Sequence, residues 1–295
     1  MTETVLPPEI AAPSLRWWAT RSALATALPL LVFFGLRPDS FGLIPNSLDP
    51  FFYTGYAINF DDVMREIGDR YYFVSRWSSY YPAYLLTKVF GAVDGRLIWR
   101  LMLCVAILLS IWHLGRRWKW TIQMEMLVGL VVITMPMFAR AFLTDYIEYT
   151  IVAYGIVLVI QCLEPRHSRV RSLFIGLMCG AIAVANPVAA TICFAPVLGY
   201  FALSPKRGRG RIGEAAILAL GAVGVVIFGL LLFRLRYGIP NVYRPSIEFA
   251  RSHQHFHDPL KAPRLDWLGQ FTWLYIQPVL LAASRHPPQS RTCLW

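Results

Sequence analysis

Long apolar segments separated by short polar ones dominate the chain. Apolar runs of the length that crosses a bilayer, about 17–25 residues, recur along it. Because these runs are continuous rather than alternating, they predict helices and not the strands of a barrel. The predicted spans lie near 17–36, 97–115, 122–139, 145–163, 173–203, 213–233 and 267–283. We expect an all-α polytopic transmembrane helical bundle of about eight spans.

The segment 173–203 is too long for one ordinary span. Asn186-Pro187 interrupts it near its middle, and proline disfavours helix in the residue before it. Basic clusters at 166–171 and 206–211 flank the segment, and short basic loops favour the cytoplasm. Since both flanks are then on the same side, the segment predicts two short spans joined at Asn186-Pro187.

The distribution of Lys and Arg also predicts the orientation of the chain. The basic loop 116–119 and the two clusters above are expected in the cytoplasm, and the N-terminus with them. The extracytoplasmic side then holds the loops 37–96, 140–145 and 235–266 and the hinge at Asn186. We expect an integral, multi-pass protein of a bacterial inner or plasma membrane.

Three parts are predicted along the chain. Residues 1–14 form a disordered cytoplasmic tail, residues 15–284 a single transmembrane domain, and residues 285–295 an irregular tail. The chain ends in SRHPPQSRTCLW directly after an apolar run.

Composition agrees with the membrane prediction. The chain is 56% hydrophobic and 15% charged, whereas a soluble domain carries about 25% charged residues. The net charge of +11 does not indicate nucleic acid as a partner, because the basic residues lie in short loops between apolar segments. The five cysteines match neither a metal motif nor a disulfide framework. Phosphate-binding glycine loops and nucleophile elbows are absent from the sequence.

The stretch 46–76 is the densest run of acidic and aromatic residues. Lipid does not accommodate such charges cheaply, so we expect short interfacial helices at the membrane surface. Asp49 directly precedes Pro50, which is typical of a helix N-cap followed by proline at the first helical position. Asp49 could also be a general base that deprotonates an acceptor hydroxyl, although its spacing alone favours the cap. The two roles are compatible.

Further acidic residues allow two interpretations each. The adjacent pair Asp61-Asp62 could bind a divalent cation, but the sequence favours the start of a surface helix. Asp145 and Glu148 have the i, i+3 spacing of a capping-box variant. Together with Arg140 they also place ionisable groups at the outer mouth of the bundle, which indicates a functional site.

Several cations are predicted on the outer face. A lipid-linked phosphate would need one or two of them, preferably arginine for its bidentate geometry. Each of them could instead reach towards lipid headgroups. These cations are Arg76, Lys88, Arg140 and Arg244. The alternating histidines of 253–257 are typical of a solvated loop, so no metal site is predicted, although an extended backbone would let them bind Zn²⁺ with Asp258.

Several pieces of the chain together resemble a known family. An early aspartate in a long outer loop is followed by an Arg…Asp-Tyr turn before a later span. The pieces are LDPFFYTGYAINF, RYYFVSRWSSYYPAYL, FARAFLTDYIEY and NVYRPSIEFA, within residues 45–250. They resemble the GT-C fold membrane glycosyltransferases, the broad group that includes the dolichyl-phosphate-mannose–protein mannosyltransferases, and most closely an uncharacterised bacterial branch.

The resemblance implies a function and a set of roles. It implies transfer of a sugar from a polyprenyl-phosphate donor to an acceptor hydroxyl on the extracytoplasmic face. Asp49 matches the position of the base, Asp145 the second acidic position, and Arg140 or Arg76 a cation that meets the phosphate. The chain lacks the adjacent Asp-Glu pair of the protein mannosyltransferases, so glycan, lipid and protein all stay open as acceptors. Members of the family usually continue with further spans, so the resemblance also implies a C-terminally shortened product. No cofactor is expected, with a divalent cation left open at Asp61-Asp62.

Two other classes of protein compete with this interpretation. A transporter or flippase of a lipid-linked or anionic substrate would use Asn186-Pro187 and Met135-Pro136 as breaks in discontinuous helices. Such a protein needs ionisable residues near the middle of its spans, whereas the sequence places them in outer loops. A non-catalytic membrane subunit is the second alternative, favoured by the unusual C-terminus.

Overall fold

The computed structural model describes residues 13–36, 48–68, 70–135, 147–164, 168–187, 189–203 and 208–248. These residues are almost entirely helical and contain no strand, which confirms the all-α prediction for this part of the chain. The chain divides into two compact units, 1–246 and 247–295, and all the elements below belong to the first. The predicted span 267–283 and the tail 285–295 lie outside the described residues.

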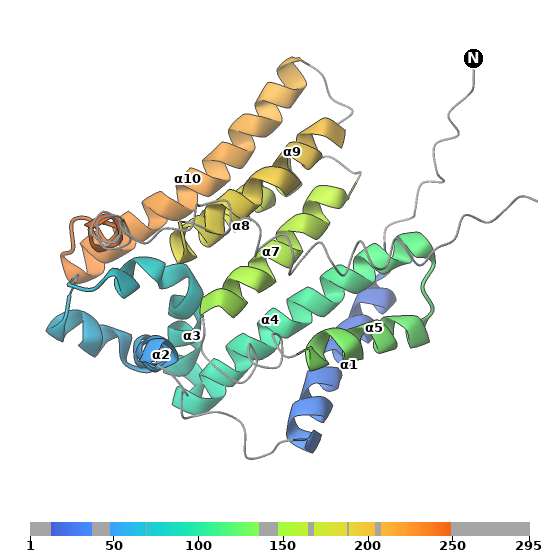
Figure 1. Ribbon diagram of the computed structural model, residues 1–295, viewed down its shortest axis with the longest axis horizontal. Helices are drawn as coiled ribbons and strands as arrows, with labels where there is room; N and C mark the ends of the chain where they lie inside the picture. The colour runs from blue at the N-terminus through green and yellow to red at the C-terminus, as the bar shows by residue number, and fades with distance from the viewer. Residues whose placement is uncertain are drawn as a thin grey trace, which may run out of the picture. The chain divides into compact units, whose positions relative to one another are not determined.

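Most of the helices coincide with the apolar segments of the sequence, and Figure 1 shows their arrangement. Helices α2 and α3 occupy the predicted loop 37–96, and the remaining α-helices occupy predicted spans. The elements are α1 (Leu15–Leu36), α2 (Leu48–Glu66), η2 (Tyr72–Arg76), α3 (Trp77–Phe90), α4 (Ala92–Gly115), η3 (Arg116–Trp118), α5 (Ile122–Thr134), α7 (Ile147–Leu163), α8 (Arg169–Ala185), η4 (Ala189–Cys193), α9 (Phe194–Leu203) and α10 (Arg209–Tyr237).

Two helices of the described residues are long and apolar enough to cross a membrane. They are Ala92–Gly115, which is α4, and Gly210–Tyr237, which is nearly all of α10. Shorter apolar helices cover Ile122–Thr134, Thr150–Leu163 and Ala189–Ala202. The structure therefore contains two candidate membrane spans within an all-helical bundle.

Helix α4 begins at Ala92, earlier than the predicted start near 97. Gly91 ends α3 with a φ of 89°, which favours glycine, and its N–H donates to the Thr87 carbonyl at 2.9 Å. Gly95 then packs against the backbone of α3, where a Cβ atom would lie 2.4 Å from the Thr87 nitrogen. The resulting tight turn extends α4 back into the predicted loop, so Arg96 lies in a helix.

Helices α8 and α10 pack side by side with their backbones in contact (Figure 1). A Cβ atom at Gly176 would lie 2.0 Å from the Leu218 carbonyl oxygen, and one at Gly180 would lie 2.6 Å from that of Ala222. Small residues at i and i+4 are typical of close packing between membrane helices. The interface between α8 and α10 has no space for an added methyl group at these positions.

The break predicted at Asn186-Pro187 is present. Helix α8 ends at Ala185, and Asn186 has an extended backbone with φ −156° and ψ 112°. This conformation is the one expected before a proline. The chain continues through η4 into α9, so the segment 173–203 forms separate helices and not one long helix.

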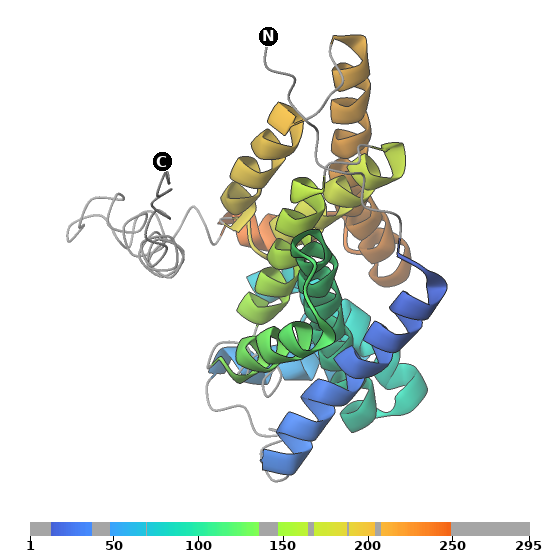
Figure 2. The same ribbon diagram turned by 90° about the vertical axis from the view of Figure 1, so that its right-hand side faces the viewer.

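Two buried clusters hold the helices together. Figure 2 shows α1 beside α4 and α5, where Ala25, Leu108, Trp112 and Ile133 form the smaller cluster. The larger cluster joins α2 and α3 to α7, α8 and α10. Its centre is aromatic and includes Tyr53, Tyr56, Phe60, Tyr80, Tyr84 and Phe233. This cluster fixes α2 and α3, which carry most of the polar side chains considered below.

Candidate functional site

Polar side chains form two groups around α2, a helix that lies in the predicted outer loop. Asn59, with φ −123° and ψ 39°, interrupts the helical backbone and separates them. The first group surrounds the N-terminal half of α2 and contains Arg76 and Arg96. The second, called the Asp61 network, lies just after the kink and consists of Asp61, Tyr84, Lys88, Arg236 and Tyr237.

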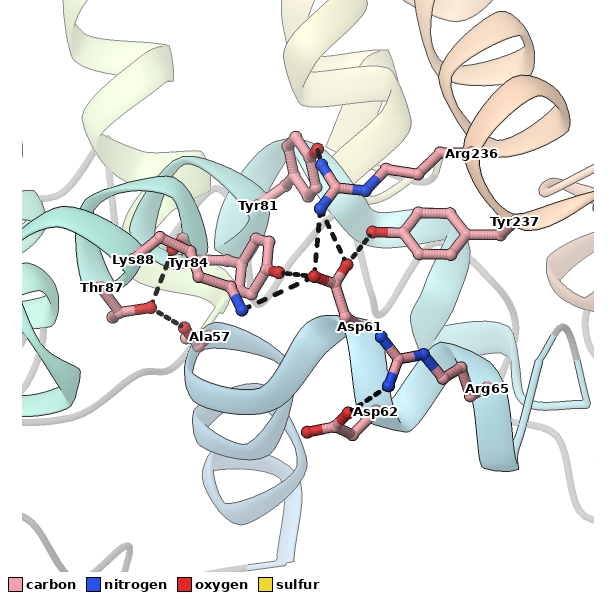
Figure 3. A network of polar contacts seen from close by, with 10 residues as sticks. All are labelled: Ala57, Asp61, Asp62, Arg65, Tyr81, Tyr84, Thr87, Lys88, Arg236 and Tyr237. Carbon is pink, nitrogen blue, oxygen red and sulfur yellow. Dashed lines mark hydrogen bonds and ion pairs between the residues drawn. The ribbon is translucent and has the colours of Figure 1, made fainter.

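The Asp61 network joins α2, α3 and α10 (Figure 3). The Arg236 guanidinium donates to both carboxylate oxygens of Asp61, at 3.1 and 3.0 Å. The Tyr237 hydroxyl donates at 2.6 Å, and the Tyr84 hydroxyl also donates to the carboxylate. The Lys88 ammonium lies 3.6 Å away. A single carboxylate therefore connects the predicted outer loop to the C-terminal end of α10.

The surroundings of Asp61 keep it ionised. Desolvation raises the pKa of this carboxyl group, but the hydroxyls of Tyr237 and Tyr84 and the charges of Arg236 and Lys88 outweigh that effect and lower it to about 2. A general base works best with a pKa near the operating pH. The geometry of Asp61 therefore favours a positioning role over proton transfer.

Asp62 points away from Asp61. Its side chain is exposed and accepts a hydrogen bond from Arg65 at 3.1 Å, one turn further along α2 (Figure 3). The two acids do not converge on one point, as a bound cation would require. Within the described part of the chain, no group of three metal-ligating side chains could hold a metal ion. The surface-helix interpretation fits Asp62 better than Asp61.

Arg76 is held beside the first half of α2. Its Nη1 donates to the Tyr53 hydroxyl at 2.7 Å, and the guanidinium lies over the Tyr72 ring at 4.7 Å from the centroid. Its Nε is buried and has no hydrogen-bond partner among the described residues. A buried donor without a partner costs about 1–3 kcal/mol. Arg76 is thus a fixed positive group whose Nε–H donates to none of the described residues.

Arg96 contacts Thr54, the residue that follows Tyr53 in α2. Its Nη1 donates to the Thr54 hydroxyl at 3.4 Å and its Nε to the Ala92 carbonyl at 3.0 Å. Arg96 and Arg100 are both buried polar residues of α4. The sequence prediction missed them because it placed Arg96 at the end of the loop 37–96 and Arg100 in the span that begins near 97. Their i, i+4 spacing was the available signal, since such residues share one face of a helix.

Asp49 lies in the first turn of α2, one helical turn before Tyr53. This spacing corresponds to about 6 Å along the helix axis. Tyr53 and Thr54 are the residues that Arg76 and Arg96 contact. Asp49 is therefore about one helical turn before the two residues that the arginines contact. Its side chain is not described.

The other predicted site residues are placed only in part. Glu148 belongs to the first turn of α7, and its side chain is not described. Arg140, Asp145 and the segment 253–258 lie outside the described residues. Arg244 is exposed, and its N–H donates to the Asn241 carbonyl at 3.2 Å. Close to Arg244 in sequence, Ser246 donates to the Tyr72 carbonyl at 3.3 Å, which brings this segment to η2.

Comparisons with protein-family models, with curated proteins and with solved structures found no match for this chain. The fold and the site thus define a helical bundle that has two candidate membrane spans and carries cations and a carboxylate network around α2.

Proposed function

We propose that the chain is an integral membrane glycosyltransferase. It moves a sugar from a polyprenyl-phosphate donor to an acceptor hydroxyl on the extracytoplasmic face. The observation that carries the proposal is Arg76, which has a buried Nε donor and is fixed by Tyr72 and by Tyr53, the residue one helical turn after Asp49 in α2. A fixed arginine suits a phosphate-bearing donor, and a carboxylate can act as the base that deprotonates an acceptor hydroxyl.

The proposed placement in the membrane has about eight spans and a cytoplasmic N-terminus. In support, the contact between Asp61 and Arg236 brings α2 to the C-terminal end of α10. At the opposite end of α4, His113 lies 3.1 Å from Glu164 at the end of α7. Basic loops follow the ends of α4 and α7 that carry His113 and Glu164, which favours the cytoplasm for that side. The opposite side, which carries Asp61, then faces outside.

The proposed reaction uses groups around the start of α2. The lipid tail of the donor stays in the bilayer while its phosphate faces Arg76. Asp49 takes the proton of the acceptor hydroxyl, and the hydroxyl oxygen attacks the anomeric carbon. The bond from that carbon to the phosphate oxygen breaks, and the phosphate leaves with its negative charge. Arg76, with Arg140 as a second cation, stabilises that charge.

The remaining predicted residues have supporting positions in this proposal. Asp145 is the second acid, and Glu148 and Arg244 contact the substrate. Asp61 and Asp62 take no part in proton transfer, because the Asp61 carboxylate is occupied by its donors and Asp62 is exposed beside Arg65.

One observation favours a second candidate, a transporter or flippase of a lipid-linked anion. Arg96 and Arg100 are buried within α4, which is a candidate span. Ionisable residues inside a span are typical of substrate pathways. Translocation of a polyprenyl-phosphate sugar across the bilayer without sugar transfer would establish this alternative.

Turnover of a labelled polyprenyl-phosphate sugar by the purified full chain in lipid nanodiscs tests the proposal. Asp49→Asn should fold, bind donor and lose turnover by about 10²–10⁴-fold, the usual contribution of a general base. Asparagine caps a helix about as well as aspartate, so a purely structural Asp49 would leave the rate unchanged. Asp62→Asn is the matched control and should keep full activity. Wild-type protein that binds donor but never transfers sugar would refute the proposal.

A further inference from the structure

Three cysteines from separate elements come together in the larger cluster. Cys162 lies at the end of α7, Cys179 lies in α8, and Cys193 is the last residue of η4. These three elements all contact one another, and Figure 1 shows α7 beside α8. Cys162 and Cys193 are buried in the cluster, and Cys179 packs against it. The fold therefore groups thiols that no spacing in the sequence connects.

Two of these thiols interact directly. Cys179 and Cys193 are joined by a side-chain hydrogen bond, and both are free thiols in this structure. A disulfide forms only between cysteines whose side chains face each other, because its sulfur atoms lie about 2.05 Å apart. The hydrogen bond shows that Cys179 and Cys193 face each other across the contact between α8 and η4.

The two thiols differ in how easily a reagent reaches them. Cys179 is partly exposed, whereas Cys193 is buried. Free cysteines often serve only as small apolar residues of a core, and Cys162 fits that role. Redox-sensitive cysteines, in contrast, are accessible and lie next to a second cysteine that resolves the first product. Cys179 and Cys193 have this second arrangement.

The pair lies on both sides of the break at Asn186-Pro187. Helix α8 ends at Ala185 and the chain continues into η4, so Cys179 precedes the break and Cys193 follows it. The ends of elements are the positions at which hinge motions change the backbone angles. A bond between the two sulfur atoms would close a loop that contains the break, and it would fix η4 against α8.

We propose that Cys179 and Cys193 are a redox-active pair, which a disulfide-bearing oxidant converts to a disulfide that locks the break between α8 and η4. The Cys179 thiolate attacks one sulfur of the oxidant, whose own sulfur–sulfur bond breaks, and the first thiol leaves. Cys193 then loses its proton and attacks the Cys179 sulfur, which releases the second thiol. The pair loses two hydrogen atoms, and the oxidant gains them as two thiols.

Peptide mapping by mass spectrometry of the purified full chain in lipid nanodiscs tests the site. The oxidant is 4,4′-dithiodipyridine, a small apolar disulfide that leaves a thiopyridyl group on a cysteine that no second thiol resolves. We expect a peptide that links Cys179 to Cys193 and carries no thiopyridyl group, and dithiothreitol should reverse the link. Cys104, which is buried in α4, should stay a free thiol or keep the thiopyridyl group.

Serine variants assign the two roles. Cys193→Ser removes the resolving thiol, so Cys179 should keep the thiopyridyl group. Cys104→Ser is the matched control and should form the Cys179–Cys193 link like the wild type. Cys162→Ser should also form the link, because Cys162 takes no part in the exchange. The mapping of the wild type with and without oxidant needs no substitution, so it decides the question even where a serine variant fails to fold.

Thermal unfolding tests whether the disulfide locks the break. It closes a loop of about 15 residues, so oxidation should raise the unfolding temperature of the wild type by about 5–10 °C. The same treatment should leave the unfolding temperature of Cys193→Ser without that rise.

Three results would overturn the inference. The first is the absence of the Cys179–Cys193 peptide after oxidation, and the second is a link from either residue to Cys162 in its place. The third is an unfolding temperature that does not rise although the link has formed. Neither measurement depends on sugar transfer, so failure of the proposed function would leave both results unchanged.

Discussion

At the scale of single residues, Asp61 shows how one side chain can serve two helices. Its carboxylate accepts from Tyr237 and Arg236 of α10 and from Tyr84 of α3. These partners supply hydrogen bonds to the carboxylate and balance its negative charge. They therefore offset the free energy that its partial burial costs. The neighbouring Asp62 pairs with the exposed Arg65 among the residues that the structure describes. Replacing Asp61 is therefore expected to reduce the free energy of unfolding more than replacing Asp62.

Asp61→Asn should destabilise the protein by about 1.5–3 kcal/mol, because hydrogen bonds to a charged group contribute that much and Arg236 and Lys88 would be left facing each other. Asp62→Asn is the matched control and should change stability by less than about 1 kcal/mol, as expected for an exposed ion pair. Thermal unfolding in nanodiscs measures both. Equal unfolding temperatures for the two variants would contradict the network.

The same carboxylate predicts a pH dependence. Its pKa falls from an ordinary value of 3.8 to about 2 in the folded chain. A group with a lowered folded-state pKa stabilises the protein above its unfolded value and loses that effect as the pH falls towards the folded one. The network should therefore contribute about 2 kcal/mol above pH 4 and progressively less between pH 4 and pH 2. Asp61→Asn should flatten the unfolding profile over this window, and an unchanged profile would count against the assignment.

At the scale of helices, the glycines between α8 and α10 set how closely the two approach. A Cβ atom on Gly221 would lie 2.6 Å from the Leu173 carbonyl oxygen, whereas one on Gly224 would meet nothing within 4 Å. Both glycines belong to α10. Gly221→Ala should destabilise by about 1–3 kcal/mol through overpacking.

Gly224→Ala provides the control on the same helix. It should be neutral or stabilise by up to about 1 kcal/mol, since alanine favours helix over glycine. Unfolding temperatures of the two variants, measured side by side, separate packing from helix propensity. A similar effect at both positions would mean that α8 and α10 do not pack as closely as the structure places them.

The helices could be predicted from the sequence better than their contacts. Hydropathy located the apolar helices, and Asn186-Pro187 located the break after α8, because both are local signals. The predicted start near 97 was later than the observed start of α4 at Ala92, because Gly91 and Gly95 determine a tight turn that hydropathy does not detect. The inward direction of Asp61 depends on Arg236, which is distant in sequence, so no local pattern could have predicted it.

At the scale of the whole first unit, two ion pairs lie near the ends of helices, and large apolar side chains occupy the middle of the long helix α10. Asp61 and Arg236 meet at one end of α10, whereas Arg21 and Glu125 pair at 2.8 Å near the starts of α1 and α5. The middle of α10 carries large apolar side chains that are exposed, among them Leu220, Val223, Ile227, Phe228 and Leu231. Exposed apolar surface of this extent is typical of a face that contacts lipid.

This distribution predicts which positions share a side of the membrane. Arg65 and Asn241 flank the Asp61 network and are both exposed. Trp118 is also exposed and follows the C-terminal end of α4. Single cysteines at these positions, in a background with the native cysteines replaced by alanine, can be tested with a membrane-impermeant maleimide. We expect Arg65→Cys and Asn241→Cys to label from outside intact cells and Trp118→Cys to label only in inverted vesicles. Labelling of Trp118→Cys from the same side as Arg65→Cys would mean that α4 does not cross the membrane. Labelling of Arg65→Cys and Asn241→Cys from opposite sides would be incompatible with the contact between Asp61 and Arg236.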